Sequence, residues 1–236
     1  MISYESAAAS FGISTKKTSQ LGNLPKPKKL ESYSDVPGFN NDTHLDNLMA
    51  LARTLPENSK VLEIGCAWGG STWALLDSLP KGCELHVCDT FGMNDPRLKA
   101  HHYNGVMKKH SHNTAVSYAM HLYLETNHRT VWDWCMKQHP RFNEVIKTVH
   151  QKPSVHLLQE DVEWDMAYID GFHSYENVSK ELEYLKNVKV LCGDDYHPAH
   201  PGCKQAINEF IAKQKDREFT HDDFETGSGF WKAIYV

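Results

Sequence analysis

The stretch Lys60-Val-Leu-Glu-Ile-Gly65-Cys-Ala-Trp-Gly69-Gly70-Ser71-Thr72 decides the fold of this chain. Its opening apolar run predicts a short buried strand, and the glycines that follow allow a tight turn. A helix is expected next, over residues 71–79, and then a second strand over residues 84–89 that ends in Asp89. Strand, glycine-rich turn, helix, strand and acid, in this order, are typical of the first βαβ unit of a doubly wound parallel sheet.

The rest of the chain extends this pattern on both sides. A helix is expected before the first strand, with Asp42-Thr43 as its N-cap and Pro56 as its end. Residues 101–112 are polar and are expected to form a loop. Further helices are expected over residues 115–125, 130–138, 175–186 and 202–213, and further strands over residues 154–158, 166–170 and 188–194.

The predicted fold class is therefore α/β, with a doubly wound and mostly parallel sheet. Residues 219–236 predict a C-terminal antiparallel hairpin at the edge of that sheet. Residues 1–41 are expected to form an N-terminal arm, because prolines, glycines and lysines interrupt any periodicity there. Residues 42–236 are expected to form one domain, with a helical insertion at about 95–150.

Composition excludes several classes of protein. The chain has 236 residues, of which 40% are hydrophobic and 23% charged, enough for a sizeable core and inconsistent with full disorder. No apolar run is long enough to span a membrane, and the N-terminus lacks a secretory signal. The net charge of −5 disfavours binding to nucleic acid.

Cysteine and histidine usage adds two expectations. The six cysteines form no Cys-x-x-Cys pair, and several lie in apolar runs, so we expect buried reduced thiols and a cytoplasmic location. The 15 histidines include no helical His-x-x-x-His pair and no companion cysteines, so no structural zinc site is expected.

The glycine-rich turn distinguishes between kinds of nucleotide ligand. A dinucleotide site would have Gly-x-Gly-x-x-Gly, whereas this chain has Gly65-x-x-x-Gly69 with Glu63 two residues before it. An acid at that position suits a positively charged ligand better than a pyrophosphate. Asp89, at the end of the next strand, is placed to accept hydrogen bonds from ribose hydroxyls. The alternatives are a buried Glu63 satisfied by helix-end amides and an Asp89 that caps a helix.

Acidic residues also follow two later strands. Asp170 and His173 come after one predicted strand, and Asp194 and Asp195 after the next. Because parallel strands end at one edge of the sheet, three carboxylates and an imidazole should converge there. Adjacent carboxylates repel each other unless a cation lies among them, and oxygen ligands favour Mg²⁺, Ca²⁺ or Mn²⁺.

Such an ion could bind two vicinal substrate hydroxyls, and His173 could then accept a proton, since an unperturbed pKa near 6.5 suits a general base. Each residue also has a structural alternative. Asp194 could cap the following turn, Asp195 could pair with Lys204, and His173 could cap the helix that begins at Tyr175.

Two motifs carry a resemblance to a known family. The stretch Glu63-Ile-Gly-x-x-x-Gly-Gly-Ser-Thr72 resembles the first motif of class I S-adenosylmethionine-dependent methyltransferases. More closely, it resembles the metal-dependent small-molecule and sugar O-methyltransferases related to the macrolide-sugar and aminocoumarin-sugar enzymes. The stretch Ile169-Asp-Gly-Phe-His-Ser-Tyr-Glu176, followed by Asp194-Asp-Tyr and Pro201-Gly-x-x-x-Ala206, resembles the second half of the same subgroup. Together the motifs cover residues 60–95 and 165–211.

This resemblance implies a Rossmann-like, seven-stranded methyltransferase fold that uses S-adenosylmethionine. It implies His173 as the catalytic base, together with Asp170, and a divalent metal, expected to be Mg²⁺, held by Asp170, Asp194 and Asp195. Residues 159–162 depart from the subgroup's pattern, which weakens the assignment of Asp161 to the adenine side. The implied cofactor-binding residues are Glu63, Gly65, Cys66, Ala67, Trp68, Gly69, Ser71, Asp89 and Asp161.

The expected function is methyl transfer to a hydroxyl of a small molecule, with a sugar as the expected acceptor. A nucleic-acid methyltransferase is the first alternative, disfavoured by the net charge and by the lack of an Asn/Asp-Pro-Pro-aromatic motif. A non-catalytic protein that binds S-adenosylmethionine is the second. The resemblance also hints at a homo-oligomer. Trp132 and Trp134 could cover a substrate, although their spacing predicts that at least one packs in the core.

Overall fold

The computed structural model describes residues 27, 29–39, 41–110, 112–158, 162–222 and 229–236. The chain divides into two compact units, which we describe separately. The sheet unit comprises Asn40–Cys66, Ala74–Thr90 and Arg141–Val236, and the helical unit comprises Met1–Phe39, Ala67–Trp73 and Phe91–Pro140.

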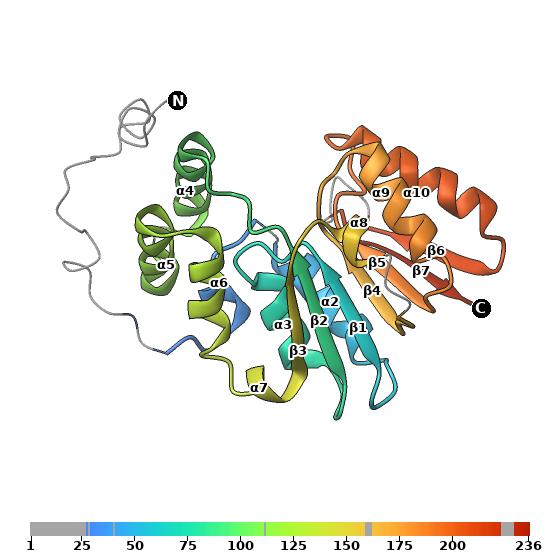
Figure 1. The fold of residues 1–236 in the computed structure, drawn as a ribbon, viewed down its shortest axis with the longest axis horizontal. Helices are drawn as coiled ribbons and strands as arrows, with labels where there is room; N and C mark the ends of the chain where they lie inside the picture. Colours follow the sequence, from blue (N-terminus) through green and yellow to red (C-terminus); the bar gives the residue numbers. More distant parts are fainter. Residues whose placement is uncertain (1–26, 28, 40, 111, 159–161, 223–228) are drawn as a thin grey trace. The chain divides into compact units, whose positions relative to one another are not determined.

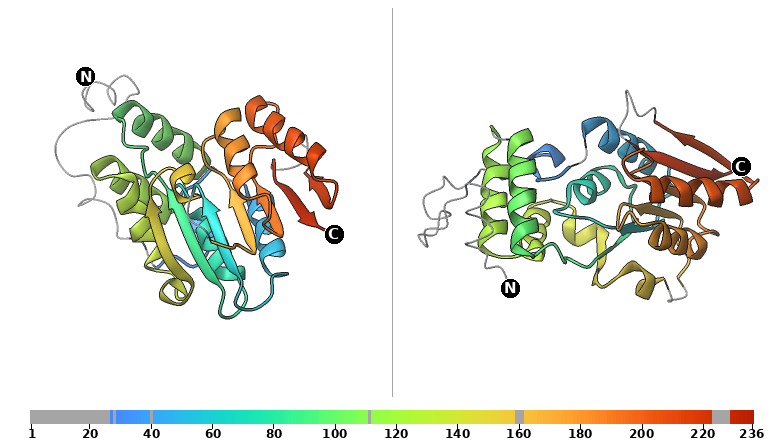
Figure 2. Two further views of the ribbon diagram at one scale, coloured as in Figure 1. Left: turned by 45° about the vertical axis from the view of Figure 1, so that its right-hand side comes forward. Right: turned by 90° about the horizontal axis from the view of Figure 1, so that it is seen from above.

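The sheet unit is built on seven strands in the order β3-β2-β1-β4-β5-β7-β6. The five strands from β3 to β5 pair in parallel, and β7 is antiparallel to both β5 and β6. The antiparallel strands form one edge of the sheet (Figure 2). The strands are β1 (Lys60–Ile64), β2 (Glu84–Asp89), β3 (Ile146–Gln151), β4 (Met166–Ile169), β5 (Val190–Gly193), β6 (Arg217–His221) and β7 (Trp231–Tyr235). The predicted α/β class and the C-terminal hairpin are confirmed.

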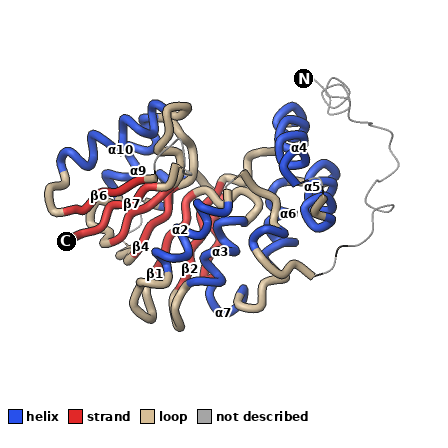
Figure 3. The backbone as a smooth tube through the Cα atoms, turned by 180° about the vertical axis from the view of Figure 1, so that it is seen from behind, coloured by secondary structure: helices blue, strands red, loops and turns tan. Residues whose placement is uncertain are grey.

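Helices cover both faces of this sheet (Figures 1 and 3). One face carries α2 (Asp42–Ala52) and the C-terminal part of α3 (Gly70–Ser78), and the other carries α8 (Ser154–Leu157), α9 (Tyr175–Tyr184) and α10 (Pro201–Lys213). A short helix, α7 (Phe142–Val145), precedes β3. Because both faces are covered, the central strands are buried almost throughout, as parallel strands usually are.

Alternation along the strands assigns side chains to the two faces. Leu62 and Ile64 of β1 join the core cluster under α8, α9 and α10, together with Ala167 and Ile169 of β4. Glu63 lies between the two β1 residues and so points to the opposite face, which α2 covers. This acid is fully buried. The fold therefore places a carboxyl group inside the layer between the sheet and α2.

The helical unit contains the 3-10 helix η2 (Tyr33–Asp35) and the helices α4 (Pro96–His110), α5 (Thr114–Glu125) and α6 (His128–Met136). Trp68 is fully buried in this unit among the rings of Phe39, Tyr123 and His128. Lys99 of α4 donates from Nζ to the carbonyl oxygens of Tyr123 and Thr126 at the end of α5. A cation at a helix C-terminus is favourable, since the last carbonyl groups are otherwise unsatisfied.

Most predicted elements are confirmed, and two are wrong. Residues 101–112 were expected to form a loop, but they belong mainly to α4, where only Lys99, Ala100 and Val106 are buried. Residues 154–158 were expected to form a strand, but they form α8, and the neighbouring strand is β3. The N-cap of α2 is Asn41, one residue before the expected position; its side chain accepts from the amide of His44.

The predicted arm, residues 1–41, stays a prediction, and its residues 1–26, 28 and 40 lie outside the described part. All six cysteines are free and buried, as expected of reduced thiols. Within the described residues, no helix has the length and apolar character needed to cross a membrane.

Candidate functional site

The candidate site lies at the carboxyl ends of β1, β2, β4 and β5, all within the sheet unit. The strand order reverses direction between β1 and β4, because β2 and β3 continue on one side of β1 and β5 on the other side of β4. Ligands of open α/β sheets bind outside the carboxyl ends of the strands at such a switch point. The predicted site residues of the sheet unit that the structure describes follow these strands or lie within them.

Gly65 joins the two sides of this switch point. Its φ of +80° lies in the left-handed region, and a Cβ placed on it would lie 2.0 Å from the carbonyl oxygen of Asp170. The amide of Asp170 in turn donates to the carbonyl of Ile64 at 2.7 Å. Only glycine fits at position 65, because the loops that follow β1 and β4 touch through their backbones.

Asp89 binds the turn that follows β1. Its Oδ2 accepts from the backbone amide of Cys66 at 3.0 Å, and the Sγ of Cys66 lies 3.6 Å from the same oxygen. The carboxylate thus fixes the start of the glycine-rich turn from the neighbouring strand end. The contact of Asp89 with ribose and its role as a helix cap both stay predictions.

The remaining residues of the turn belong to the helical unit. Ala67 has a φ of +44°, and its carbonyl oxygen accepts from Nε2 of His128 at 2.5 Å. Gly69 has a φ of +104°, and a Cβ there would lie 2.4 Å from the Cε of Met136. Trp68 and Ser71 are buried. The positive φ of Gly69 is open to glycine at no cost, whereas the left-handed conformation of Ala67 is a strained one that the surrounding structure must maintain. Asp161 lies outside the described residues.

A buried chain of two hydrogen bonds and one ion-pair contact links two of the predicted acids. The hydroxyl of Tyr168 donates to Oδ2 of Asp170 at 3.0 Å, and the same hydroxyl lies 2.8 Å from Nε2 of His44. On its other side, Nδ1 of His44 lies 3.5 Å from Oδ1 of Asp194. Both His44 and Tyr168 are fully buried. The chain therefore runs from Asp194, which follows β5, through His44 of α2 and Tyr168 of β4 to Asp170.

The protons of this chain follow from its donors. A tyrosine hydroxyl has one proton, and a carboxylate can only accept, so the tyrosine oxygen must accept from Nε2–H of His44. Burial, together with the charges of Asp170, Asp194 and Glu63, raises the pKa of Tyr168 well above its usual value. The hydroxyl therefore stays protonated and remains a donor to Asp170.

Asp194 and Asp195 form a tight turn after β5. The amide of Asp195 donates to Oδ1 of Asp194 at 2.6 Å, and Asp195 itself has a φ of +64°. The indole Nε1 of Trp231 donates to the carbonyl of Asp194 at 3.1 Å. Burial raises the pKa of Asp194. A non-glycine residue in the left-handed region is strained, and such strain is concentrated at functional sites.

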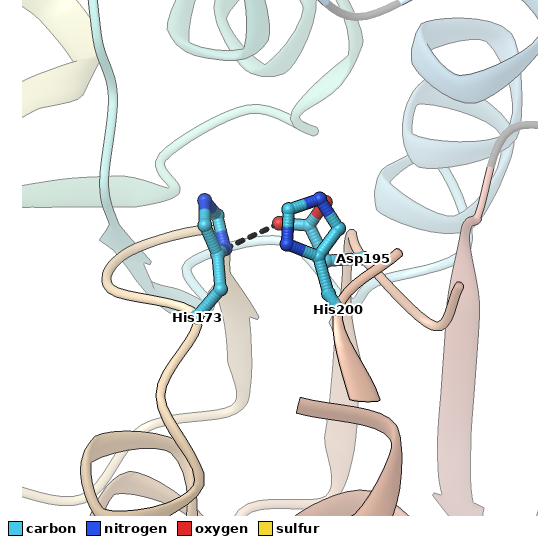
Figure 4. Close-up of side chains that lie close together, drawn as sticks. All are labelled: His173, Asp195 and His200. Atoms are coloured by element: carbon cyan, nitrogen blue, oxygen red, sulfur yellow. Dashed lines mark ion pairs between the residues drawn. The ribbon is translucent and has the colours of Figure 1, made fainter. Parts of the chain in front are cut away.

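His173 forms an ion pair with Asp195, and His200 lies beside the same carboxylate (Figure 4). Nδ1 of His173 contacts Oδ2 of Asp195, and Nε2 of His200 lies 3.3 Å from Oδ1. The ring centroids of His173 and His200 are 4.7 Å apart. Each oxygen of Asp195 thus faces a different histidine.

The pKa values of the pair reflect their contact. Burial alone would lower the pKa of His173, but the hydrogen bond to Asp195 and the charges of Asp195 and Asp194 raise it above its usual value. Burial would raise the pKa of Asp195, but the hydrogen bond and charge of His173 lower it. The pair is therefore a carboxylate that orients an imidazole and favours its protonated form.

The structural alternatives for His173 and Asp195 are not what the structure has. The helix α9 is capped by Ser174, whose Oγ accepts from the amide of Asn177, and not by His173. Lys204 lies over the ring of Tyr196, whereas Asp195 pairs with the two histidines. Asp194 does accept from the amide that follows it, as a turn-capping aspartate would.

The donor chemistry of the three predicted metal ligands suits a hard cation, since all three are carboxylates at neighbouring strand ends. The positions of the three carboxylates do not form one close cluster. Among the described residues, the group whose donor atoms lie within 4.8 Å of one another is His173, Asp195 and His200. Asp170 and Asp194 instead interact with Tyr168 and His44. The structure brings Asp195 to His173 and not all three acids into one cluster, so the ligand set Asp170, Asp194 and Asp195 stays a prediction.

A further acid lies under the loop that carries His173. Glu181 of α9 is buried, and its Oε1 accepts from the hydroxyl of Ser154. Burial raises the pKa of Glu181 to about 7, against smaller opposing effects of Ser154 and His173. At neutral pH this carboxyl group is therefore partly protonated.

Sequence patterns alone did not identify four of these residues. His44 and Glu181 lie on the buried faces of α2 and α9, and Tyr168 lies within a buried strand, so periodicity marks all three as core positions. His200 had a usable signal, because it directly precedes Pro201 at the start of a helix near the predicted acids. Sequence spacing could not show that it reaches Asp195.

The comparisons with known proteins support the fold. No protein-family model matches the sequence, and no curated protein matches it. Among solved structures, the chain is similar to an O-methyltransferase from Bacillus cereus in complex with SAH, with a TM-score of 0.54 and 16% identity over 100% of this chain and 93% of that one. It is also similar to the O-methyltransferase TomG from Streptomyces achromogenes, which is involved in tomaymycin synthesis and was solved with SAM, with a TM-score of 0.50 and 14% identity over 100% and 92%. At this identity the likeness establishes the fold, which is that of class I methyltransferases.

Proposed function

We propose that this chain, which has the class I methyltransferase fold, transfers a methyl group from S-adenosylmethionine to a hydroxyl of a small molecule. A sugar is the proposed acceptor class, and His173 is the proposed base. The observation that carries the proposal is the contact of Gly65 with Asp170. It joins the glycine-rich turn, which would hold the methyl donor, to the loop that carries His173.

The cofactor half of the proposal rests on the ends of β1 and β2. S-adenosylmethionine, when bound, supplies an electrophilic methyl group on a positively charged sulfur. Glu63 provides a buried negative charge just before the turn, and Asp89 holds the amide of Cys66. The turn continues through Ala67, Trp68, Gly69 and Ser71, which are proposed to contact the cofactor, as is Asp161.

The base half rests on the pair of His173 and Asp195. Because Nδ1 of His173 faces Asp195, its Nε2 is the nitrogen that would accept the hydroxyl proton. Nε2 of His173 would accept the hydroxyl proton while the bound S-adenosylmethionine would supply the methyl group to the acceptor oxygen and be released as S-adenosylhomocysteine. Asp195 then stabilises the imidazolium that forms. A base in this role contributes about 10²–10⁴-fold in rate.

The metal half of the proposal rests on the chemistry of three carboxylates. Asp170, Asp194 and Asp195 would hold a divalent ion, with Mg²⁺ proposed because all the donors are oxygens. Such an ion, when bound, lowers the pKa of a coordinated hydroxyl. Tyr168 and His44 hold one oxygen each of Asp170 and Asp194, and so orient these side chains whether or not an ion is bound.

The proposed acceptor class has support from one exposed side chain. Phe172 lies between Asp170 and His173 in the chain and is 73% exposed, although large apolar side chains are usually covered. An exposed aromatic ring beside the base offers a face on which a sugar or another ring can stack. Trp132, by contrast, is fully buried and belongs to the core, in agreement with the prediction that at least one of Trp132 and Trp134 packs there.

Calorimetric titration of S-adenosylhomocysteine into the full chain, first with Mg²⁺ and then with EDTA, tests the cofactor and the metal together. Binding in both conditions, followed by methyl transfer to hydroxylated acceptors only when Mg²⁺ is present, is the expected result. Absence of binding in both conditions would overturn the proposal. Binding without transfer to any hydroxylated acceptor would favour a non-catalytic binding protein, and transfer to RNA or DNA would favour the other alternative.

A further inference from the structure

The cluster of His173, Asp195 and His200 shares Asp195 with the proposed Mg²⁺ site and adds two imidazoles that the Mg²⁺ site does not use. Two imidazoles and one carboxylate lie with their donor atoms within 4.8 Å of one another. They come from two loops, one after β4 and one between β5 and α10 (Figure 4). Imidazole nitrogen is a ligand of Zn²⁺, Co²⁺ and related ions, whereas Mg²⁺ prefers oxygen.

We propose that His173, Asp195 and His200 form a binding site for a divalent transition-metal ion of the Zn²⁺ class. We propose also that an ion bound there inhibits methyl transfer, because it occupies the base. The second statement rests on the proposed function. The first does not, since it depends only on the three side chains and their geometry.

One pair of the donor atoms has the separation that a tetrahedral ion requires. Nitrogen and oxygen ligands lie about 2.0–2.2 Å from zinc, so two ligands at a tetrahedral angle are roughly 3.3–3.6 Å apart. Nε2 of His200 and Oδ1 of Asp195 are already 3.3 Å apart. Nδ1 of His173 makes direct contact with Oδ2, so a small rotation of this half-exposed side chain would admit the ion. Three protein ligands leave a fourth position open for water.

The segment that carries Asp195 and His200 is held by its own hydrogen bonds. The amide of His197 donates to the carbonyl of Asp195 at 2.7 Å, and the amide of His200 donates to the carbonyl of His197 at 3.0 Å. Asp195 is in the left-handed conformation, and its amide binds Asp194. The backbone thus presents Asp195 and His200 toward each other before any ion binds, which reduces the entropic cost of binding.

Metal binding and base function at His173 exclude each other. A neutral imidazole has one nitrogen with a lone pair and one with a proton. In the proposed base, Nδ1–H faces Asp195 and Nε2 has the lone pair. If Nδ1 gives its lone pair to a metal ion, the proton must be on Nε2, and that nitrogen can no longer accept a proton from the hydroxyl. An ion at this site therefore blocks the base.

The test uses Co²⁺ and Zn²⁺ as probes of the full chain. Co²⁺ binding is followed by its visible absorption, and Zn²⁺ binding by calorimetry, for the wild type, His200→Ala and His156→Ala. His156 is an exposed histidine of α8 outside the cluster, and so controls for general surface chelation. We expect the wild type and His156→Ala to bind alike and His200→Ala to bind more than roughly tenfold more weakly, since loss of even an outer-shell partner costs that much.

Equal binding by the wild type and His200→Ala would overturn the site and leave an ordinary pair of Asp195 with two histidines. Circular dichroism without metal checks that the variants fold, and His200→Gln is the second variant if His200→Ala does not. Once an acceptor is known, Zn²⁺ should inhibit the wild type and His156→Ala more strongly than His200→Ala, with each variant compared to its own activity in Mg²⁺ alone. Failure of S-adenosylhomocysteine to bind would overturn the proposed function and leave the metal-binding result standing.

Discussion

His44 and Tyr168 are hydrogen bonded 2.8 Å apart in the interior of the sheet unit, on the face that α2 covers. Through this contact, α2, which precedes β1 in the chain, helps to position the carboxylates of Asp170 and Asp194, which follow β4 and β5. Tyr168 binds Asp170, and His44 faces Asp194. The positions of the two acids therefore depend on residues that a comparison of active-site motifs would not include.

Tyr168→Phe should destabilise the fold. The substitution removes the hydroxyl and leaves Nε2–H of His44 buried without its acceptor, which costs about 1–3 kcal/mol. Urea unfolding measures the change in the free energy of unfolding. Tyr175→Phe is the matched control, because it removes a surface hydrogen bond to Glu209 and should cost less than about 1 kcal/mol. Equal losses in the two variants would contradict the role of the buried chain.

His173→Ala should lower kcat by about 10²–10⁴-fold and leave binding of S-adenosylhomocysteine unchanged, because the variant loses the proposed base and no cofactor contact. Steady-state kinetics and calorimetry separate the two effects. His156→Ala should leave both unchanged. If His173→Ala kept its turnover, another group would have to accept the proton.

Gly65→Ala should destabilise the fold by at least about 1–2 kcal/mol, the cost of a non-glycine residue in the left-handed region. Overlap of the new Cβ with the carbonyl of Asp170 adds to this cost. Thermal unfolding measures it. Gly70→Ala is the control in the same turn, since a Cβ there meets nothing within 4 Å and Gly70 begins α3. That control should be neutral or slightly stabilising, so a loss of equal size would show that the turn tolerates no side chain at all.

Glu181→Gln should remove part of the pH dependence of stability. The pKa of Glu181 is raised from 4.5 to about 7 in the folded chain, so the folded state binds more protons than the unfolded state between these values. The contribution of Glu181 to the free energy of unfolding is fully present below about pH 4.5 and is lost as the pH rises through about 7. The loss amounts to up to about 3 kcal/mol.

Urea unfolding at pH 5 and pH 8 measures this effect. The wild type should lose more stability than Glu181→Gln over that interval. Glu176→Gln, an exposed position of the same helix, should follow the wild type. If the free energy of unfolding changed with pH in the same way for the wild type and for Glu181→Gln, ionisation of Glu181 would not destabilise the fold.

The order of strands and helices around the glycine-rich turn could be predicted from the sequence, because its signals are local. β1 and β2 are short apolar runs, and the positive φ of Gly65 needs glycine. β3 had no such signal. It is an edge strand, half-exposed along its length, and it lacks the alternation of a strand with one buried face. The short apolar run at residues 154–158 predicts a strand there instead, because such a run does not distinguish a strand from a helix.

The helix α4 shows the same limit for polar segments. Its histidines and lysines give little apolar periodicity, and tertiary packing of Lys99, Ala100 and Val106 stabilises it. In the candidate site, the residues that follow strand ends were predictable, because topology fixes where they lie. The partners His44, Tyr168 and His200 were not, since their contacts join parts of the chain that only the folded structure brings together.

The six buried thiols can report the local unfolding of the segments that carry them. The thiols lie on the strands, on the helices α6 and α10, and in the loops that begin at Cys66 and end at Cys83. Burial raises the pKa of the Cys203 thiol to about 12, so both access and ionisation oppose reaction in the folded state. A thiol reagent would therefore label each cysteine only as fast as its own segment opens. Mass spectrometry of the labelled peptides would then give the order in which the sheet and the helices unfold, without any added probe.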